Sequence, residues 1–147
     1  MGGSTNTILH LLAAAPNVFF KSLQRPKAMI TTDIEDEEAE SFGLGKVCEL
    51  NWKQVLDLYA CTECGRCREL CPTTITHKPL EPVLYLKSVR DRLYAEQPAL
   101  LGDPGENGGG SEHELVPAVV DPEVIWACTT CRWCERACPL EITYVDK

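Results

Sequence analysis

Eight of the nine cysteines in this chain lie in two short phrases with the same spacing. The first phrase, ACTECGRCRELCP, covers residues 60–72, and the second, ACTTCRWCERACP, covers residues 127–139. Both follow C-x2-C-x2-C-x3-C-P, a spacing that is typical of thiolate ligands to [4Fe–4S] clusters. The phrases therefore predict two [4Fe–4S] clusters, whose ligands would be Cys61, Cys64, Cys67, Cys71, Cys128, Cys131, Cys134 and Cys138.

The longer step before the fourth cysteine of each phrase predicts an exchange of ligands. Three thiolates two residues apart can wrap around one cluster, whereas the fourth is carried away and, in two-cluster proteins, binds the other cluster. A proline follows each fourth cysteine and turns the chain out of the loop, because it has no backbone N–H. We assign the first cluster to Cys61, Cys64, Cys67 and Cys138. The second cluster is assigned to Cys128, Cys131, Cys134 and Cys71.

Other uses of clustered cysteines are the alternatives to this interpretation. Structural zinc prefers two C-x-x-C pairs separated by a longer loop, and a zinc-binding adaptor module is the alternative function. Disulfides would leave the internal repeat unexplained. Substrate chemistry at a cluster needs an open iron site, which usually means a missing cysteine, and neither phrase lacks one. No phosphate-binding loop or small-molecule substrate site is evident, so we expect the electron-transfer component of an oxidoreductase and no catalytic residue.

The composition is that of a globular chain of 147 residues, 44% hydrophobic and 24% charged. Its formal net charge of −8 argues against nucleic acid and anionic lipid as partners, because both carry negative charge. The N-terminus lacks the positive region of a signal peptide, and its apolar run from Ile8 to Ala15 is too short to span a bilayer. We expect a cytoplasmic protein, either free or held at the inner face of the membrane through a partner.

The local patterns predict helices that lead into both phrases. Asn51 is a good N-cap for WKQVLDLYA, in which apolar residues recur on one face at helical spacing: Trp52, Val55, Leu56 and Tyr59. Asp121-Pro122-Glu123 starts the helix before the second phrase. A further amphipathic helix within LEPVLYLKSVRDRLYAE carries Val83, Leu86, Val89 and Leu93. No strand pattern is convincing, so the predicted fold is all-α, with two pseudo-repeated halves, each a helix, a cluster loop and a helix.

The domain organisation follows from the segments between these patterns. Residues 1–45 are expected to form an N-terminal extension with an acidic run at Asp33, Glu35, Asp36, Glu37, Glu38 and Glu40. Residues 46–147 would form the two-cluster domain, with a flexible insert near 102–112, GDPGENGGGSE. Cys48 lies outside both phrases and is expected to be a buried small hydrophobe.

Two phrases of this kind, each preceded by a helix, resemble the α-helical ferredoxin domain. That domain occurs in the iron–sulfur subunits of succinate dehydrogenase and fumarate reductase, and in one of the subunits of anaerobic glycerol-3-phosphate dehydrogenase. Over residues 16–147 the chain is similar to the heterodisulfide-reductase-like (Fe–S)-binding oxidoreductases, through PNVFFKSL, the acidic run, WKQVLDLYACTECGRC and VIWACTTC. The resemblance implies electron transfer with redox partner proteins, namely a flavin or CCG-domain subunit and a membrane cytochrome or quinone-linked subunit. The sequence shows neither membrane helices before residue 16 nor a CCG domain, so we expect a separate subunit or a piece of a longer oxidoreductase.

Overall fold

The structure is a computed structural model that describes residues 8, 11–16, 35, 43–101 and 114–145. All regular secondary structure in these parts is helical and none of it is a strand, which confirms the predicted all-α class. Residues 11–16 are helical. The later helices are η1 (Val47–Glu49, a 3-10 helix), α2 (Trp52–Ala60), α3 (Arg66–Glu69), α4 (Pro72–Ile75), α5 (Pro82–Leu101), α6 (Pro122–Trp126) and α7 (Trp133–Ala137).

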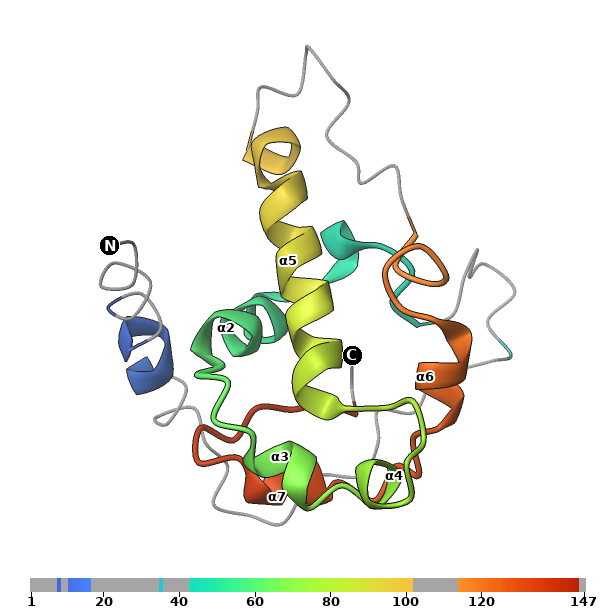
Figure 1. The fold of residues 1–147 in the computed structure, drawn as a ribbon. Helices are drawn as coiled ribbons and strands as arrows, with labels where there is room; N and C mark the ends of the chain where they lie inside the picture. The colour runs from blue at the N-terminus through green and yellow to red at the C-terminus, as the bar shows by residue number, and fades with distance from the viewer. Residues whose placement is uncertain (1–7, 9–10, 17–34, 36–42, 102–113, 146–147) are drawn as a thin grey trace, which may run out of the picture.

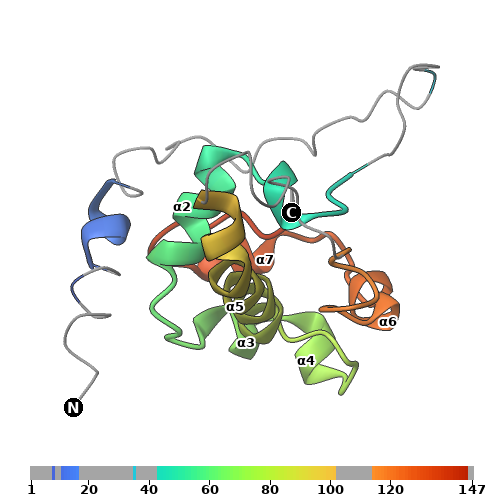
Figure 2. The same cartoon turned by 90° about the horizontal axis from the view of Figure 1, so that it is seen from above.

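The long helix α5 is the centre of the fold. Figure 1 shows α2 on one side of α5 and α6 on the other, with α3, α4 and α7 gathered near its N-terminal end. The view along α5 in Figure 2 also shows α2 and α6 on different sides of α5. The predicted apolar stripe of α5 is confirmed, because Leu86, Val89 and Leu93 are buried and Val83 packs against them. Among the described residues, no helix has both the length and the apolar character that crossing a membrane requires.

Helix α2 begins where the sequence predicts, because its N-terminus is capped in both directions. The Asn51 side chain accepts a hydrogen bond from the Gln54 amide at 2.9 Å, and the Gln54 side chain accepts one from the Asn51 amide at 2.9 Å. The apolar pattern indicates the buried face of α2 only in part, because two of its four residues pack against the core. Asp57 and Leu58 are completely buried, whereas Trp52 is 65% exposed.

The other helix predictions have clear outcomes. The helix start at Asp121 is confirmed, since the Asp121 carboxylate accepts a hydrogen bond from the Glu123 amide at 2.8 Å and Pro122 opens α6. The prediction for Cys48 was wrong, because its side chain is exposed. Val47, the residue before Cys48 in η1, is only 2% exposed and faces the core. Successive residues of a helix point in different directions, so Cys48 faces away from the core. The acidic run apart from Glu35 and the insert at 102–112 lie outside the described residues.

Candidate functional site: two cysteine-lined cavities

The two cysteine phrases adopt matching backbone conformations. Glu63 and Thr130, which occupy the same position in the two phrases, have φ angles of 55° and 51°. Gly65 and Arg132, also equivalent, have φ angles of 81° and 57°. Each phrase therefore contains two left-handed residues, a conformation that few non-glycine residues adopt. This curls the chain into a loop, and a short helix then begins at the next residue, α3 in the first phrase and α7 in the second.

Packing of α3 against α7 brings the two phrases together. One cavity, which we call the N-terminal cavity, has four cysteines in its lining, Cys61, Cys64, Cys67 and Cys138. A second, the C-terminal cavity, has four others in its lining, Cys71, Cys128, Cys131 and Cys134. Each cavity thus combines the first three cysteines of one phrase with the fourth cysteine of the other.

The two cavities differ in size and in exposure to solvent. The C-terminal cavity has a volume of about 290 Å³, and two of its thiols, Cys128 and Cys131, are exposed. The N-terminal cavity is narrower, about 10 Å³, and of its thiols only Cys64 is exposed. Its other three cysteines belong to the hydrophobic core that also contains Leu58 and Ile142. A group bound in the N-terminal cavity would therefore be shielded from water much more than one bound in the C-terminal cavity.

Burial also changes the acidity of the thiols. It is the main reason why the pKa values of Cys61, Cys67 and Cys138 lie above the usual range of a cysteine thiol. Burial, followed by the nearby Glu135 carboxylate, raises the pKa of Cys134 to about 12. These thiols hold their protons at neutral pH. Iron binds thiolates, so binding of iron at these cavities has to release the protons.

The cysteine sulfurs have hydrogen-bonding neighbours in both cavities. The Tyr144 hydroxyl donates to the Cys67 sulfur at 3.4 Å, in the N-terminal cavity. In the C-terminal cavity the Thr130 amide donates to the Cys128 sulfur at 3.4 Å, and the Cys71 sulfur lies 2.8 Å from the Thr73 hydroxyl. Such contacts matter for a metal site, because hydrogen bonds to ligand sulfurs change the properties of the metal that they hold.

A buried arginine from α5 lies beside the N-terminal cavity. Arg90 is 6% exposed and donates to the Glu63 carboxylate at 2.7 Å, so it anchors the first cysteine loop to α5. Its positive charge also lowers the pKa of Cys61, against the larger effect of burial. Sequence reasoning missed Arg90, although its position four residues after Leu86 and three before Leu93 places it on the apolar face of α5.

Two buried carboxylates hold the segment that carries Tyr144. Asp57 of α2 accepts hydrogen bonds from the Thr143 amide at 3.2 Å and the Thr143 hydroxyl at 2.8 Å. Glu135 of α7 accepts from the amides of Tyr144 and Val145 at 2.9 and 3.1 Å. Tyr144 itself lines both cavities. The sequence gives no local signal for Tyr144, since its partners lie far away in the chain.

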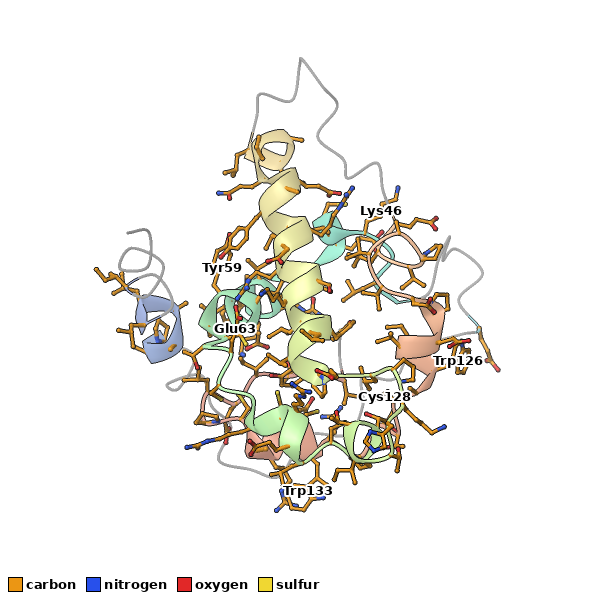
Figure 3. The ribbon with its side chains drawn as sticks, viewed as in Figure 1. Lys46, Tyr59, Glu63, Trp126, Cys128 and Trp133 are labelled. Atoms are coloured by element: carbon orange, nitrogen blue, oxygen red, sulfur yellow. The ribbon has the colours of Figure 1, made fainter. Side chains whose placement is uncertain are left out.

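Exposed aromatic residues flank the cysteine loops. Trp126, directly before the second phrase, is 87% exposed, and Ile125 and Trp126 both contribute to the lining of the C-terminal cavity. Trp133 is about half exposed, and the Arg136 guanidinium lies 5.3 Å from the centre of its ring. Figure 3 shows both tryptophans at the edge of the molecule. Trp133 therefore gives only partial shielding from water.

The donor set of each cavity suits an iron–sulfur cluster. Four thiols converge from two separate loops, and thiolates are the usual ligands of [4Fe–4S] clusters. The nine cysteines, all in the described part of the chain, form no disulfide. Among the described residues, no three His, Cys, Asp or Glu side chains are arranged around a position for a single metal ion.

Comparison with known proteins identifies the domain. Residues 53–139, more than half of the chain, match the family described as the 4Fe-4S dicluster domain. The probable iron-sulfur-binding oxidoreductase FadF of Bacillus subtilis is 36% identical, with 94% of this chain and 23% of that protein covered. The EtfAB:quinone oxidoreductase of Syntrophomonas wolfei is 33% identical, with 94% of this chain and 21% of that protein covered. A probable membrane-anchored ferredoxin of Chromohalobacter salexigens is 34% identical, with 83% of this chain and 20% of that protein covered.

The chain thus spans about a fifth of the length of the curated relatives that it matches. No solved structure is significantly similar to it. The family description gives [4Fe–4S] clusters, and two of the relatives are named as oxidoreductases, one of them iron-sulfur-binding. Together they support electron transfer by a [4Fe–4S] ferredoxin domain. The chain therefore belongs to the 4Fe-4S dicluster domain family.

Proposed function

We propose that this chain binds two [4Fe–4S] clusters and carries single electrons between protein partners of a heterodisulfide-reductase-like oxidoreductase. The first cluster would be held by Cys61, Cys64, Cys67 and Cys138. The second would be held by Cys128, Cys131, Cys134 and Cys71. When bound, each cluster supplies reversible one-electron redox chemistry, and the chain supplies its ligands, its shielding from water and its hydrogen bonds.

The observation that carries this proposal is the sorting of eight thiols into two cavities with four in each lining. Each set mixes the two phrases in the pattern that the spacing predicts for two-cluster proteins. A single loop would have gathered all four cysteines of one phrase. The mixed sets support a protein that holds two clusters, each bound by cysteines from both phrases.

The names of the relatives and the resemblance of the sequence support a choice of partners. One relative is named for EtfAB and a quinone, and another is named as membrane-anchored. We place this domain between a flavin-type or CCG-domain partner and a quinone-linked or membrane-bound acceptor. Residues 46–147 would form this electron-transfer domain, with residues 1–45 as an N-terminal extension. Membrane association would come through the acceptor.

The experiment is purification of the chain under anaerobic conditions, with iron, sulfide and zinc analysis and EPR of the reduced protein. We expect about eight iron and about eight sulfide per chain, from two four-iron clusters. Cys48→Ala is the matched control, since Cys48 is an exposed cysteine outside both phrases and its loss should leave the iron content unchanged. A colourless protein with stoichiometric zinc would overturn the proposal in favour of a zinc adaptor module.

Electron transfer itself is tested by redox cycling. The reduced protein should pass its electrons to a soluble quinone such as menadione, and the visible absorption should return fully after each cycle. Irreversible bleaching on the first reoxidation, in protein with full iron content, would contradict an electron-transfer role.

A further inference from the structure

We propose that Tyr144 is a positioning residue that raises the reduction potential of the cluster in the N-terminal cavity, by donating a hydrogen bond to Cys67. This inference rests on the proposed function, because it assumes a cluster held by Cys61, Cys64, Cys67 and Cys138. It assigns to Tyr144 a role that the cysteine pattern does not contain.

Tyr144 and Cys67 are in direct contact. The Tyr144 hydroxyl oxygen lies 3.4 Å from the Cys67 sulfur, and both side chains are buried. In the cluster-bound protein this sulfur would be a thiolate, which is a better hydrogen-bond acceptor than a thiol.

Hydrogen bonds to two carboxylates hold the backbone around Tyr144 in place. The residues on both sides of its backbone are bound by carboxylates, Asp57 through Thr143 and Glu135 through Val145. Asp57 is completely buried and Glu135 is 9% exposed. Burying a carboxylate is costly unless hydrogen bonds compensate for the lost water, so these two groups fix the segment strongly. The backbone that carries the Tyr144 side chain is therefore held in place beside Cys67.

The direction of the effect follows from charge. An electron added to the cluster makes its cysteine sulfurs more negative, and a hydrogen bond to a sulfur becomes stronger. The Tyr144 hydroxyl therefore stabilises the reduced form more than the oxidised form. Burial in the core acts in the opposite direction, since it disfavours the more negative form. Tyr144 would thus offset part of the cost that burial imposes on reduction in the N-terminal cavity.

The test is an EPR-monitored redox titration of the complete chain and of Tyr144→Phe. The two midpoint potentials are assigned with Cys64→Ala and Cys131→Ala, each of which removes one thiol from one cavity. We expect Tyr144→Phe to lower the reduction potential of the N-terminal cluster. At the midpoint potential of this cluster in the wild-type protein, the ratio of reduced to oxidised cluster should fall about fivefold in the variant. The C-terminal cluster should shift much less, because the hydroxyl bonds to Cys67 and not to a thiol of that set.

Tyr85→Phe is the matched control. Tyr85 lines the C-terminal cavity, so losing its hydroxyl should leave the potential of the N-terminal cluster unchanged. No shift in Tyr144→Phe, or an equal shift of both clusters, would overturn the assignment of Tyr144 while leaving the two-cluster proposal intact. Wild-type protein without two titrating clusters would instead overturn the proposed function.

A second variant covers the case in which Tyr144→Phe loses iron. Replacing Tyr144 with 3-fluorotyrosine keeps the ring and makes the hydroxyl a stronger donor, because fluorine lowers the pKa of the phenol. This variant should raise the potential of the N-terminal cluster, opposite in sign to the phenylalanine variant. An unchanged or lowered potential would contradict the hydrogen-bonding role.

Discussion

The exchange of the fourth ligand can be tested by pairing cysteine substitutions. Cys71 belongs to the first phrase but shares the lining of the C-terminal cavity with Cys131, whereas Cys64 lines the N-terminal cavity. Alanine is the right replacement, because a serine hydroxyl could still bind iron. Cys71→Ala alone should damage the cluster held mainly by the second phrase, so that one intact [4Fe–4S] cluster remains per chain.

The double variants then separate the two ligand arrangements. With exchanged ligands, Cys71→Ala/Cys131→Ala removes two ligands of the same cluster, so about four iron should remain per chain. Cys71→Ala/Cys64→Ala removes one ligand from each cluster, so almost no intact [4Fe–4S] cluster should remain. Without exchange the two outcomes are reversed, because Cys71 and Cys64 would then share a cluster.

The assay is iron and sulfide analysis after anaerobic reconstitution, combined with EPR of the reduced protein. EPR is needed because a cluster that loses one thiolate can survive with three irons. Iron analysis alone does not distinguish the iron of such a cluster from that of an intact [4Fe–4S] cluster. The reduced [4Fe–4S] signal should persist in Cys71→Ala/Cys131→Ala and disappear in Cys71→Ala/Cys64→Ala. The reverse pattern would refute the exchange and the assignment of Cys71 and Cys138.

Three further predictions concern the scaffold, and all are measured as shifts in the thermal unfolding midpoint of anaerobic protein at a single scan rate. Asp57→Ala should destabilise the fold by about 3 kcal/mol, since Thr143 loses a charged acceptor for two hydrogen bonds, which lowers the midpoint by roughly 10 °C. Asp91→Ala is the control, because the Asp91 side chain is 56% exposed and its loss should change stability by less than about 0.5 kcal/mol. If Asp57→Ala and Asp91→Ala lowered the midpoint equally, the stabilising role of the buried Asp57 carboxylate would be refuted. Gly65→Ala should lower the free energy of unfolding by about 1 kcal/mol, because Gly65 has a left-handed φ of 81°. The loss would come from backbone strain and not from a clash, since no atom lies within 4 Å of the added Cβ. An unchanged midpoint would contradict this strain.

Much of the fold could be predicted because its signals are local. The cap at Asn51, the Asp121-Pro122 helix start and the apolar stripe of α5 each depend on residues within a few positions, and the structure confirms all three. The spacing of the cysteines is equally local. The two ligand sets that it indicates stay a prediction, and they have the same members as the thiols that line the two cavities.

The rest could not be predicted because it depends on contacts between distant residues. The apolar face of α2 suggested that Trp52 would be buried, yet Asp57 takes the core position because Thr143 provides hydrogen bonds from 86 residues away. The same holds for Tyr144, whose contact with Cys67 spans 77 residues. Cys48 was misjudged because one turn of 3-10 helix decides which side chain faces the core.

The mixed origin of each set of thiols has a consequence for the unfolded chain. A cluster bound as proposed would act as a cross-link, closing one long loop from Cys61 to Cys138 and another from Cys71 to Cys128. Closing a loop of this length restricts the denatured ensemble by about 4 kcal/mol, if the chain-entropy treatment of disulfides applies. An oxidant that destroys one cluster would then remove one of the two cross-links between the phrases. The fold that holds the surviving cluster would become less stable, so that cluster would dissociate more readily.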